Sequence, residues 1–92
     1  MERRVVITGL GVVSPVGTGV EKFWNSLLEG KSGIAPITRF DAADFPVKIA
    51  GEVKDFDPAL AGDKKTIRHM DRNAQFAVAA ARMAVEDAKL DM

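Results

Sequence analysis

The sequence has 92 residues, of which 47% are hydrophobic and 28% are charged; 13 basic and 13 acidic side chains give a formal net charge of zero. This balance excludes a uniformly basic nucleic-acid-binding domain and is far from the composition of disordered chains. There is no cysteine and one histidine, which excludes disulfides, thiolate metal sites and a cysteine nucleophile from this stretch of chain.

The chain begins with a candidate buried strand. Residues 3–10 read RRVVITGL, with an unbroken β-branched run at 5–7, which is typical of a strand buried on both faces of a parallel or mixed sheet. The uncharged stretch 5–20 contains glycines and a proline, so it does not read as a membrane-spanning helix, and no signal-peptide cleavage site follows. We therefore expect a cytoplasmic protein with no membrane partner.

A first helix is predicted over residues 19–29. Thr18 and Glu21 have the spacing of a capping box, in which a hydroxyl and a carboxylate each accept a hydrogen bond from a backbone N–H at a helix start, and Gly30 is placed to end the helix. Its large side chains recur every three or four residues and predict an apolar face that packs against a sheet, with Phe23 and Trp24 in the core. They are Val20, Phe23, Trp24, Leu27 and Leu28.

Two strands are predicted next, over residues 34–40 and 47–53. Their β-branched and aromatic content favours strands, and the acidic, proline-bearing segment 41–46 between them suits a loop. The Gly- and Pro-rich segment 9–17 is expected to be a turn, and no helix should begin directly after the first strand.

The last part of the chain is predicted to be helical. Asp57 followed by Pro58 is the pattern of an N-cap with proline at the first helical position, and Asp71 is placed to cap a long helix over 72–90. This helix has a narrow polar stripe, so its wide apolar arc needs more cover than the rest of this chain offers. We expect residues 1–92 to be one structural unit and a portion of a larger α/β domain.

Gly9 and Gly11 follow the first predicted strand and resemble the opening of a dinucleotide-binding unit. That motif needs a third glycine or alanine at position 14 and a helix that starts there. Ser14 and Pro15 stand at these positions, so a structural glycine turn is the favoured interpretation.

Two further groups of polar side chains could in principle bind a metal ion. Glu52, Asp55 and Asp57 lack the glycine turn and closing glutamate of a calcium loop, so capping and solvation explain them better. His69 has no second ligand at a suitable spacing and is expected to be a surface residue. The sequence predicts no metal site, no cofactor site and no catalytic residue in this chain.

A basic group on one helical face is the most informative surface feature. Lys64, Lys65 and Arg68 share a face if this segment is helical, and Asp63 is the only acid nearby. Such a patch is commonly a solvated face. It can also be a docking site for an acidic partner, where the charges steer encounter and fix register. Composition alone leaves both interpretations open.

Four motifs together resemble the N-terminus of the bacterial β-ketoacyl-[acyl-carrier-protein] synthases, most of all the synthase II type. They cover essentially the whole chain, and their order is far more specific than a single glycine pattern. They are RRVVITGLGVVSPVG at 3–17, GKSGI at 30–34, ITRFDAADFPVKIAGEVKDFDP at 37–58 and MDRNAQFAVAAARMAVEDA at 70–88.

The resemblance implies a thiolase-like fold of α-β-α-β-α layers, with this chain in the first α/β half, and a homodimer. It also implies decarboxylative Claisen condensation between malonyl-carrier protein and an acyl group held as a thioester on a cysteine, assisted by two histidines and an oxyanion hole. In this family those groups lie downstream of the matched region, so this chain alone should be inactive. No metal or organic cofactor is implied, because phosphopantetheine belongs to the carrier.

The resemblance also gives the basic group a role. Synthases of this type receive the acidic recognition helix of acyl carrier protein on a basic patch that Lys65 and Arg68 match, and Lys64 adds a neighbouring charge. His69 stands where relatives commonly have a basic residue. Three alternatives stay open: a non-catalytic subunit like a chain-length factor, a fragment that only supports a dimer and carrier contact, and the ketosynthase of an aromatic polyketide system. A downstream cysteine followed by two histidines would identify a condensing enzyme.

Overall fold

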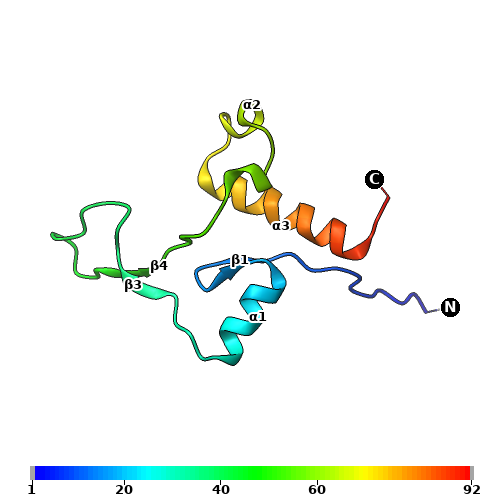
Figure 1. The fold of residues 1–92 in the computed structure, drawn as a ribbon, viewed down its shortest axis with the longest axis horizontal. Coiled ribbons are helices and arrows are strands. Elements are labelled where there is room, and N and C mark those ends of the chain that lie inside the picture. The colour runs from blue at the N-terminus through cyan, green and yellow to red at the C-terminus, as the bar shows by residue number, and fades with distance from the viewer. Residues whose placement is uncertain (1, 92) are drawn as a thin grey trace. The chain divides into compact units, whose positions relative to one another are not determined.

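A computed structural model describes residues 2–91, which divide into two units. The middle unit is Val13–Phe56, and the terminal unit combines residues 2–12 with 57–91. The elements in chain order are two short hairpins that flank one helix, followed by three helical elements (Figure 1). Each unit is described by itself.

The middle unit begins with a small hairpin that the sequence did not predict. β1 (Val13–Ser14) pairs antiparallel with β2 (Gly17–Thr18), and Pro15 and Val16 form the turn. Gly17 has a φ of 154°, which a residue with a side chain rarely adopts. The predicted turn is therefore present, and the residues on either side of it pair as two short strands.

α1 (Val20–Leu28) follows this hairpin directly, and its predicted capping box is wrong. Gly19 is the N-cap, without a side-chain hydrogen bond. The reason is that the backbone of Thr18 belongs to β2, where it pairs with Val13, so Thr18 cannot take the N-cap position. Its buried hydroxyl has no hydrogen-bond partner among the described residues.

The end of α1 agrees with the prediction. Gly30 has a φ of 72°, and its N–H donates to the Leu27 carbonyl while the Lys31 N–H donates to the Ser26 carbonyl. These two bonds are those of a Schellman motif, which satisfies carbonyl groups at a helix end. The apolar face of α1 does not form a core within the described residues, because Trp24 is 57% exposed and Phe23 is half-buried.

The second hairpin confirms that both predicted strands, 34–40 and 47–53, are present, but each is shorter than predicted. β3 (Ile34–Pro36) pairs antiparallel with β4 (Ile49–Gly51), with Ala35 opposite Ala50. The Ile37 N–H adds one bond to the Lys48 carbonyl. The strands lie side by side and a loop joins them (Figure 1), so the loop predicted at 41–46 is confirmed.

The terminal unit contains the helical elements η1 (Pro58–Leu60), α2 (Lys64–Ile67) and α3 (Arg72–Ala88). As predicted, Asp57 accepts the Ala59 N–H at 3.0 Å and Asp71 accepts the Ala74 N–H at 2.8 Å. Ala61 and Ala79 are buried between these elements, and α3 contacts η1. The core of this unit is thus made of small side chains.

The strand predicted over residues 3–10 does not form in the described residues. Residues 2–12 have no regular secondary structure and no strand paired with them, and Val5 is 94% exposed. A strand exists only when a neighbouring strand accepts and donates its backbone hydrogen bonds. The β-branched run supplies the propensity for a strand, but no described segment supplies the partner.

Candidate docking surface

α2 carries the predicted basic residues on a well-defined helical turn. The Asp63 carboxylate accepts the Thr66 N–H at 2.8 Å and begins the helix. The Arg68 N–H donates to the Lys64 carbonyl at 3.2 Å, so the helical geometry continues through Arg68. Lys64, Lys65 and Arg68 therefore lie within one turn of each other, and we call these three residues the basic cluster.

The basic cluster is exposed to solvent. All three residues are exposed, and none of them forms an ion pair within residues 2–91. His69 follows directly and is also exposed, as predicted. The helical turn on which the predicted shared face depends is confirmed, and the docking role of the basic cluster stays a prediction.

Asp63 is the one acid at the start of the cluster, and its charge is used within the helix. Hydrogen bonds from the Thr66 backbone and side chain hold the pKa of Asp63 below its usual range. The carboxylate therefore stays ionised at neutral pH and faces the free N–H groups of the first turn, where a negative charge is favourable. The three cations outnumber it, so the local charge is positive.

Gly9 and Gly11 have a structural role, as expected. A Cβ atom on Gly9 would collide with the Ala84 carbonyl, and one on Gly11 would collide with the Ala80 carbonyl. The two glycines let the backbone of this segment approach α3 closely, and the Leu10 N–H donates to Asp87 at 3.0 Å. No helix begins after Gly11, so the geometry of a dinucleotide-binding turn is absent from this segment.

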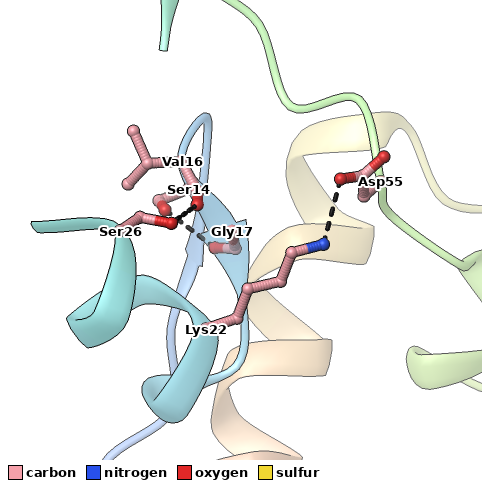
Figure 2. Close-up of polar contacts among 6 residues, drawn as sticks. All are labelled: Ser14, Val16, Gly17, Lys22, Ser26 and Asp55. Carbon is pink, nitrogen blue, oxygen red and sulfur yellow. Dashed lines mark hydrogen bonds and ion pairs between the residues drawn. The ribbon is translucent and has the colours of Figure 1, made fainter. Parts of the chain in front are cut away.

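The candidate carboxylates also have structural roles. Glu52 accepts hydrogen bonds from the Thr38 N–H and hydroxyl and from the Arg39 N–H. Asp55 pairs with Lys22 at 3.1 Å (Figure 2), and Asp57 caps η1. Residues 2–91 contain no group of three or more His, Cys, Asp or Glu side chains that could hold a metal ion.

Two serines are polar anchors that the sequence analysis did not find. The Ser26 hydroxyl donates to the Val16 carbonyl at 2.7 Å, and the Ser14 hydroxyl donates to the Gly17 carbonyl at 2.8 Å. Figure 2 shows the Ser26 hydroxyl directed at Val16 in the turn of the first hairpin and the Ser14 hydroxyl directed at Gly17 in β2. Ser26 is only 5% exposed. The signal was present in the sequence, since Ser26 is a small polar residue inside a helix of large apolar side chains.

Known proteins resemble this chain along nearly its whole length. Residues 2–92 match the family described as beta-ketoacyl synthase, N-terminal domain. The 3-oxoacyl-[acyl-carrier-protein] synthase 2 of Coxiella burnetii (strain RSA 493 / Nine Mile phase I) is 60% identical over 91 residues, which are 99% of this chain and 22% of that protein. The protein of the same name from Synechocystis sp. (strain ATCC 27184 / PCC 6803 / Kazusa) is 49% identical over 97% of this chain and 21% of its own length.

A solved structure is similar in fold as well. The ishigamide ketosynthase/chain length factor matches with a TM-score of 0.88 and 50% sequence identity, over 99% of this chain and 23% of the solved chain. The present chain thus spans about a fifth of the length of the curated relatives that it matches. None of the helices in residues 2–91 is long and apolar enough to cross a membrane.

Proposed function

The chain belongs to the beta-ketoacyl synthase family, whose N-terminal domain it matches over residues 2–92, and we propose that it is part of a 3-oxoacyl-[acyl-carrier-protein] synthase of fatty-acid synthesis. The observation that carries this proposal is the 60% identity over 91 residues to the Coxiella burnetii synthase 2. The small α/β architecture of the chain agrees with a ketosynthase neighbour. Activity, substrates and partners are proposed for the full-length protein that carries this sequence.

The proposed reaction is a decarboxylative Claisen condensation. An acyl group moves from its carrier to a cysteine Sγ, which forms a thioester and releases the carrier thiol. Malonyl-carrier protein loses carbon dioxide, and the resulting carbanion attacks the thioester carbonyl. A carbon–carbon bond forms, the bond to Sγ breaks, and the sulfur leaves with the electron pair. The present chain contains no cysteine and one histidine, so the nucleophile and its assisting histidines come from another part of the full-length protein.

We propose that residues 1–92 form the N-terminal portion of the first half of a thiolase-like, five-layered fold, in a cytoplasmic homodimer. The wide apolar faces favour this placement. Trp24, Leu28 and Val5 are all more than half exposed within the described residues, and exposed apolar area of this kind is characteristic of surfaces that other protein segments cover. Packing of further layers against α1 and against residues 3–10 would supply that cover.

The basic cluster is proposed to receive an acidic face of acyl carrier protein. Like charges three or four residues apart on a helix destabilise it by roughly 0.2–0.5 kcal/mol per pair. Lys64 and Arg68 have this spacing, and so do Lys65 and Arg68. A short helix that keeps such repulsion violates a local rule, and such violations concentrate at functional sites. An acidic partner would relieve the repulsion on binding and would be steered toward the cluster.

A charge-reversal variant of the full-length enzyme tests this role. Changing Lys65→Glu and Arg68→Glu should lower kcat/KM for carrier-bound substrates about tenfold or more, since two favourable charge contacts become repulsive. Transfer from a carrier-free acyl thioester should stay within about twofold. The matched control is Lys48→Glu with Lys54→Glu, two exposed lysines whose reversal changes the net charge equally. Equal losses with both substrate types, or equal losses in the control, would contradict carrier docking.

Condensation itself is tested on the full-length protein with malonyl- and acyl-carrier protein. Release of carbon dioxide together with a 3-oxoacyl product supports the enzyme, and intact mass identifies the species that was assayed. The isolated chain is expected to be inactive in the same assay. A full-length protein that binds the carrier without condensation would contradict the proposed activity.

A second candidate function comes from the solved neighbour, the ishigamide ketosynthase/chain length factor. At 50% identity, the present chain is compatible with a non-catalytic subunit of the second kind or with a polyketide ketosynthase. The full-length sequence distinguishes the first case, because a condensing enzyme needs a cysteine and two histidines downstream. Product length distinguishes fatty-acid from polyketide chemistry.

A further inference from the structure

A recess lies beside the basic cluster, between η1 and α2. Its volume is about 390 Å³, and its lining includes Pro58, Ala59 and Ile67. Gly62 connects the two helical elements with a φ of 152°, a backbone conformation that side-chain-bearing residues rarely adopt. The recess is therefore built by the sharp connection at Gly62, which brings a proline-started turn against the apolar side of α2.

The recess and the basic cluster are continuous. Lys64 belongs to the basic cluster and also lines the recess, so its aliphatic stem contributes apolar surface while its ammonium group reaches solvent. Arg68 lies one helical turn further on the same helix. A partner that contacts Lys64 therefore lies next to the recess.

Charges alone do not make a strong interface here. Ion pairs between exposed side chains contribute little to affinity and are screened by salt, although they speed encounter and fix orientation. Stable protein interfaces typically combine a polar rim with an apolar contact from which water is excluded. The recess supplies such a contact directly beside the charged rim.

The carboxylates at the rim do not reverse this charge pattern. Asp57 accepts the Ala59 N–H at 3.0 Å, and Asp63 accepts the Thr66 N–H at 2.8 Å. Both carboxylates therefore face the first-turn N–H groups of their own helical elements, whose partial positive charge offsets theirs. The three ammonium and guanidinium groups of the basic cluster have no such internal partner among residues 2–91.

We propose that the recess lined by Pro58, Ala59 and Ile67 receives an apolar side chain from the acidic helix that docks on the basic cluster. This inference rests on the proposed docking of a carrier protein and adds its second contact. The occupant is an amphipathic helix that presents carboxylates to the three cations and an aliphatic or aromatic side chain to the recess. The charges orient the partner, and burial of that side chain slows its release.

Ala59 offers a substitution that fills the recess without changing the charge. Its side chain is exposed, and the hydrogen bond to Asp57 uses only its backbone N–H. The full-length enzyme with Ala59→Leu should bind holo-acyl carrier protein about five- to tenfold more weakly, as expected when one central contact is lost. Ala59→Gln blocks the same space with a polar side chain and is expected to show the same loss. It replaces the leucine variant if that variant does not fold.

Ala43 provides a closely matched control. It is also an exposed alanine two residues after an aspartate, and its N–H donates to Asp41 at 3.0 Å. Ala43→Leu should leave carrier binding within about twofold of wild type, since surface substitutions away from a contact have small effects. Binding is measured by calorimetry with holo-acyl carrier protein at low and at high salt, and melting curves verify the fold of each variant.

The salt dependence separates the two contacts. The loss caused by Ala59→Leu should persist at high salt because an apolar contact is not screened, whereas the loss caused by Lys65→Glu with Arg68→Glu should shrink. If Ala59→Leu and Ala59→Gln bind like wild type while the charge-reversal variant is weakened, the recess is not a contact and carrier docking stands. If wild type does not bind the carrier, or charge reversal has no effect, carrier docking is wrong and the recess inference falls with it.

Discussion

Residues 3–10 and residues 34–53 both have strand-forming sequences, but only the second region forms strands among the described residues. β3 finds its partner in β4, on the other side of one loop, and Ile34 lies opposite Gly51. Residues 3–10 have no described strand beside them. Closing a short loop costs little chain entropy, so a hairpin carries its partner with it. The comparison teaches that strand propensity becomes a strand only where the fold supplies a neighbour.

What holds the N-terminal segment is distant in sequence. The Leu10 N–H donates to Asp87, 77 residues further along the chain, and Gly11 packs its backbone against the Ala80 carbonyl of α3. In contrast, Glu52 holds the hairpin from a position 14 residues after Thr38. Changes to the first region should therefore disrupt long-range packing, while changes to the second should remain local.

The largest effect is expected from Gly11→Val in the full-length protein. A Cβ at this position would lie 2.8 Å from the Met83 Cβ and 2.9 Å from the Ala80 carbonyl carbon, so the segment must move away from α3. Overpacking of this severity costs about 3 kcal/mol, measured by chemical denaturation. The control is Glu2→Ala, at an exposed polar position of the same segment, with an expected cost of at most about 0.5 kcal/mol. Equal costs for the two would show that close approach to α3 does not hold the segment.

A smaller effect is expected from Ser26→Ala, which tests a local polar anchor in the middle unit. The substitution removes the 2.7 Å hydrogen bond to the Val16 carbonyl and leaves that carbonyl without its donor, at a cost of about 1–2 kcal/mol. Asn25→Ala, an exposed position on the same helix, should change the free energy of unfolding by at most about 0.5 kcal/mol. An unchanged unfolding midpoint for Ser26→Ala would show that this hydrogen bond does not stabilise α1.

The smallest effect is expected from the exposed carboxylate of Glu52, and it depends on pH. The hydrogen bond from the Thr38 side chain, with further bonds from the Thr38 and Arg39 backbones, lowers the pKa of Glu52 in the folded state. A lowered folded-state pKa means that the ionised form stabilises the fold at neutral pH. This contribution is lost as the pH falls below the ordinary glutamate value of about 4.3.

Glu52→Gln should therefore destabilise the protein at pH 7, and the difference from wild type should shrink on acidification. Melting temperatures of the two proteins between pH 7 and pH 3 measure this convergence. Thr38→Val removes the hydroxyl donor that contributes most to the lowering of the Glu52 pKa. When Thr38→Val is present in both proteins, the pH-dependent difference in melting temperature that Glu52→Gln causes should therefore be smaller. A gap between Glu52→Gln and wild type that stays constant with pH would mean that the charge of Glu52 is not involved.

The predictions from sequence succeeded where the signal and its structural partner are close together. Asp57 and Asp71 cap elements that begin at the next residue, and Gly30 ends α1 through bonds to the preceding turn. The order of β3 and β4 was predictable for the same reason. The capping box at Thr18 failed because a competing hairpin, also local but unrecognised, occupied that residue.

The candidate site divides in the same way. The Asp63 cap was found only in the structure, whereas the shared face of Lys64, Lys65 and Arg68 follows from helical spacing and could be predicted from the residues alone. The recess beside it could not, because its lining comes from two helical elements whose approach depends on the backbone angle at Gly62. No pattern in the sequence reports the volume that such a connection leaves open.

The helix starts at Asp57 and Asp71, the two strands of the second hairpin and the resemblance to the family all follow from the amino-acid sequence. The folded structure was needed to show that residues 3–10 form no strand among the described residues, that Gly9 and Gly11 pack closely on α3, and that a recess adjoins the basic cluster. The physical reason is the range of the interactions. Caps, turns and hairpins are closed by residues a few positions apart, whereas strand partners and recesses are formed by segments that only the folded chain brings together.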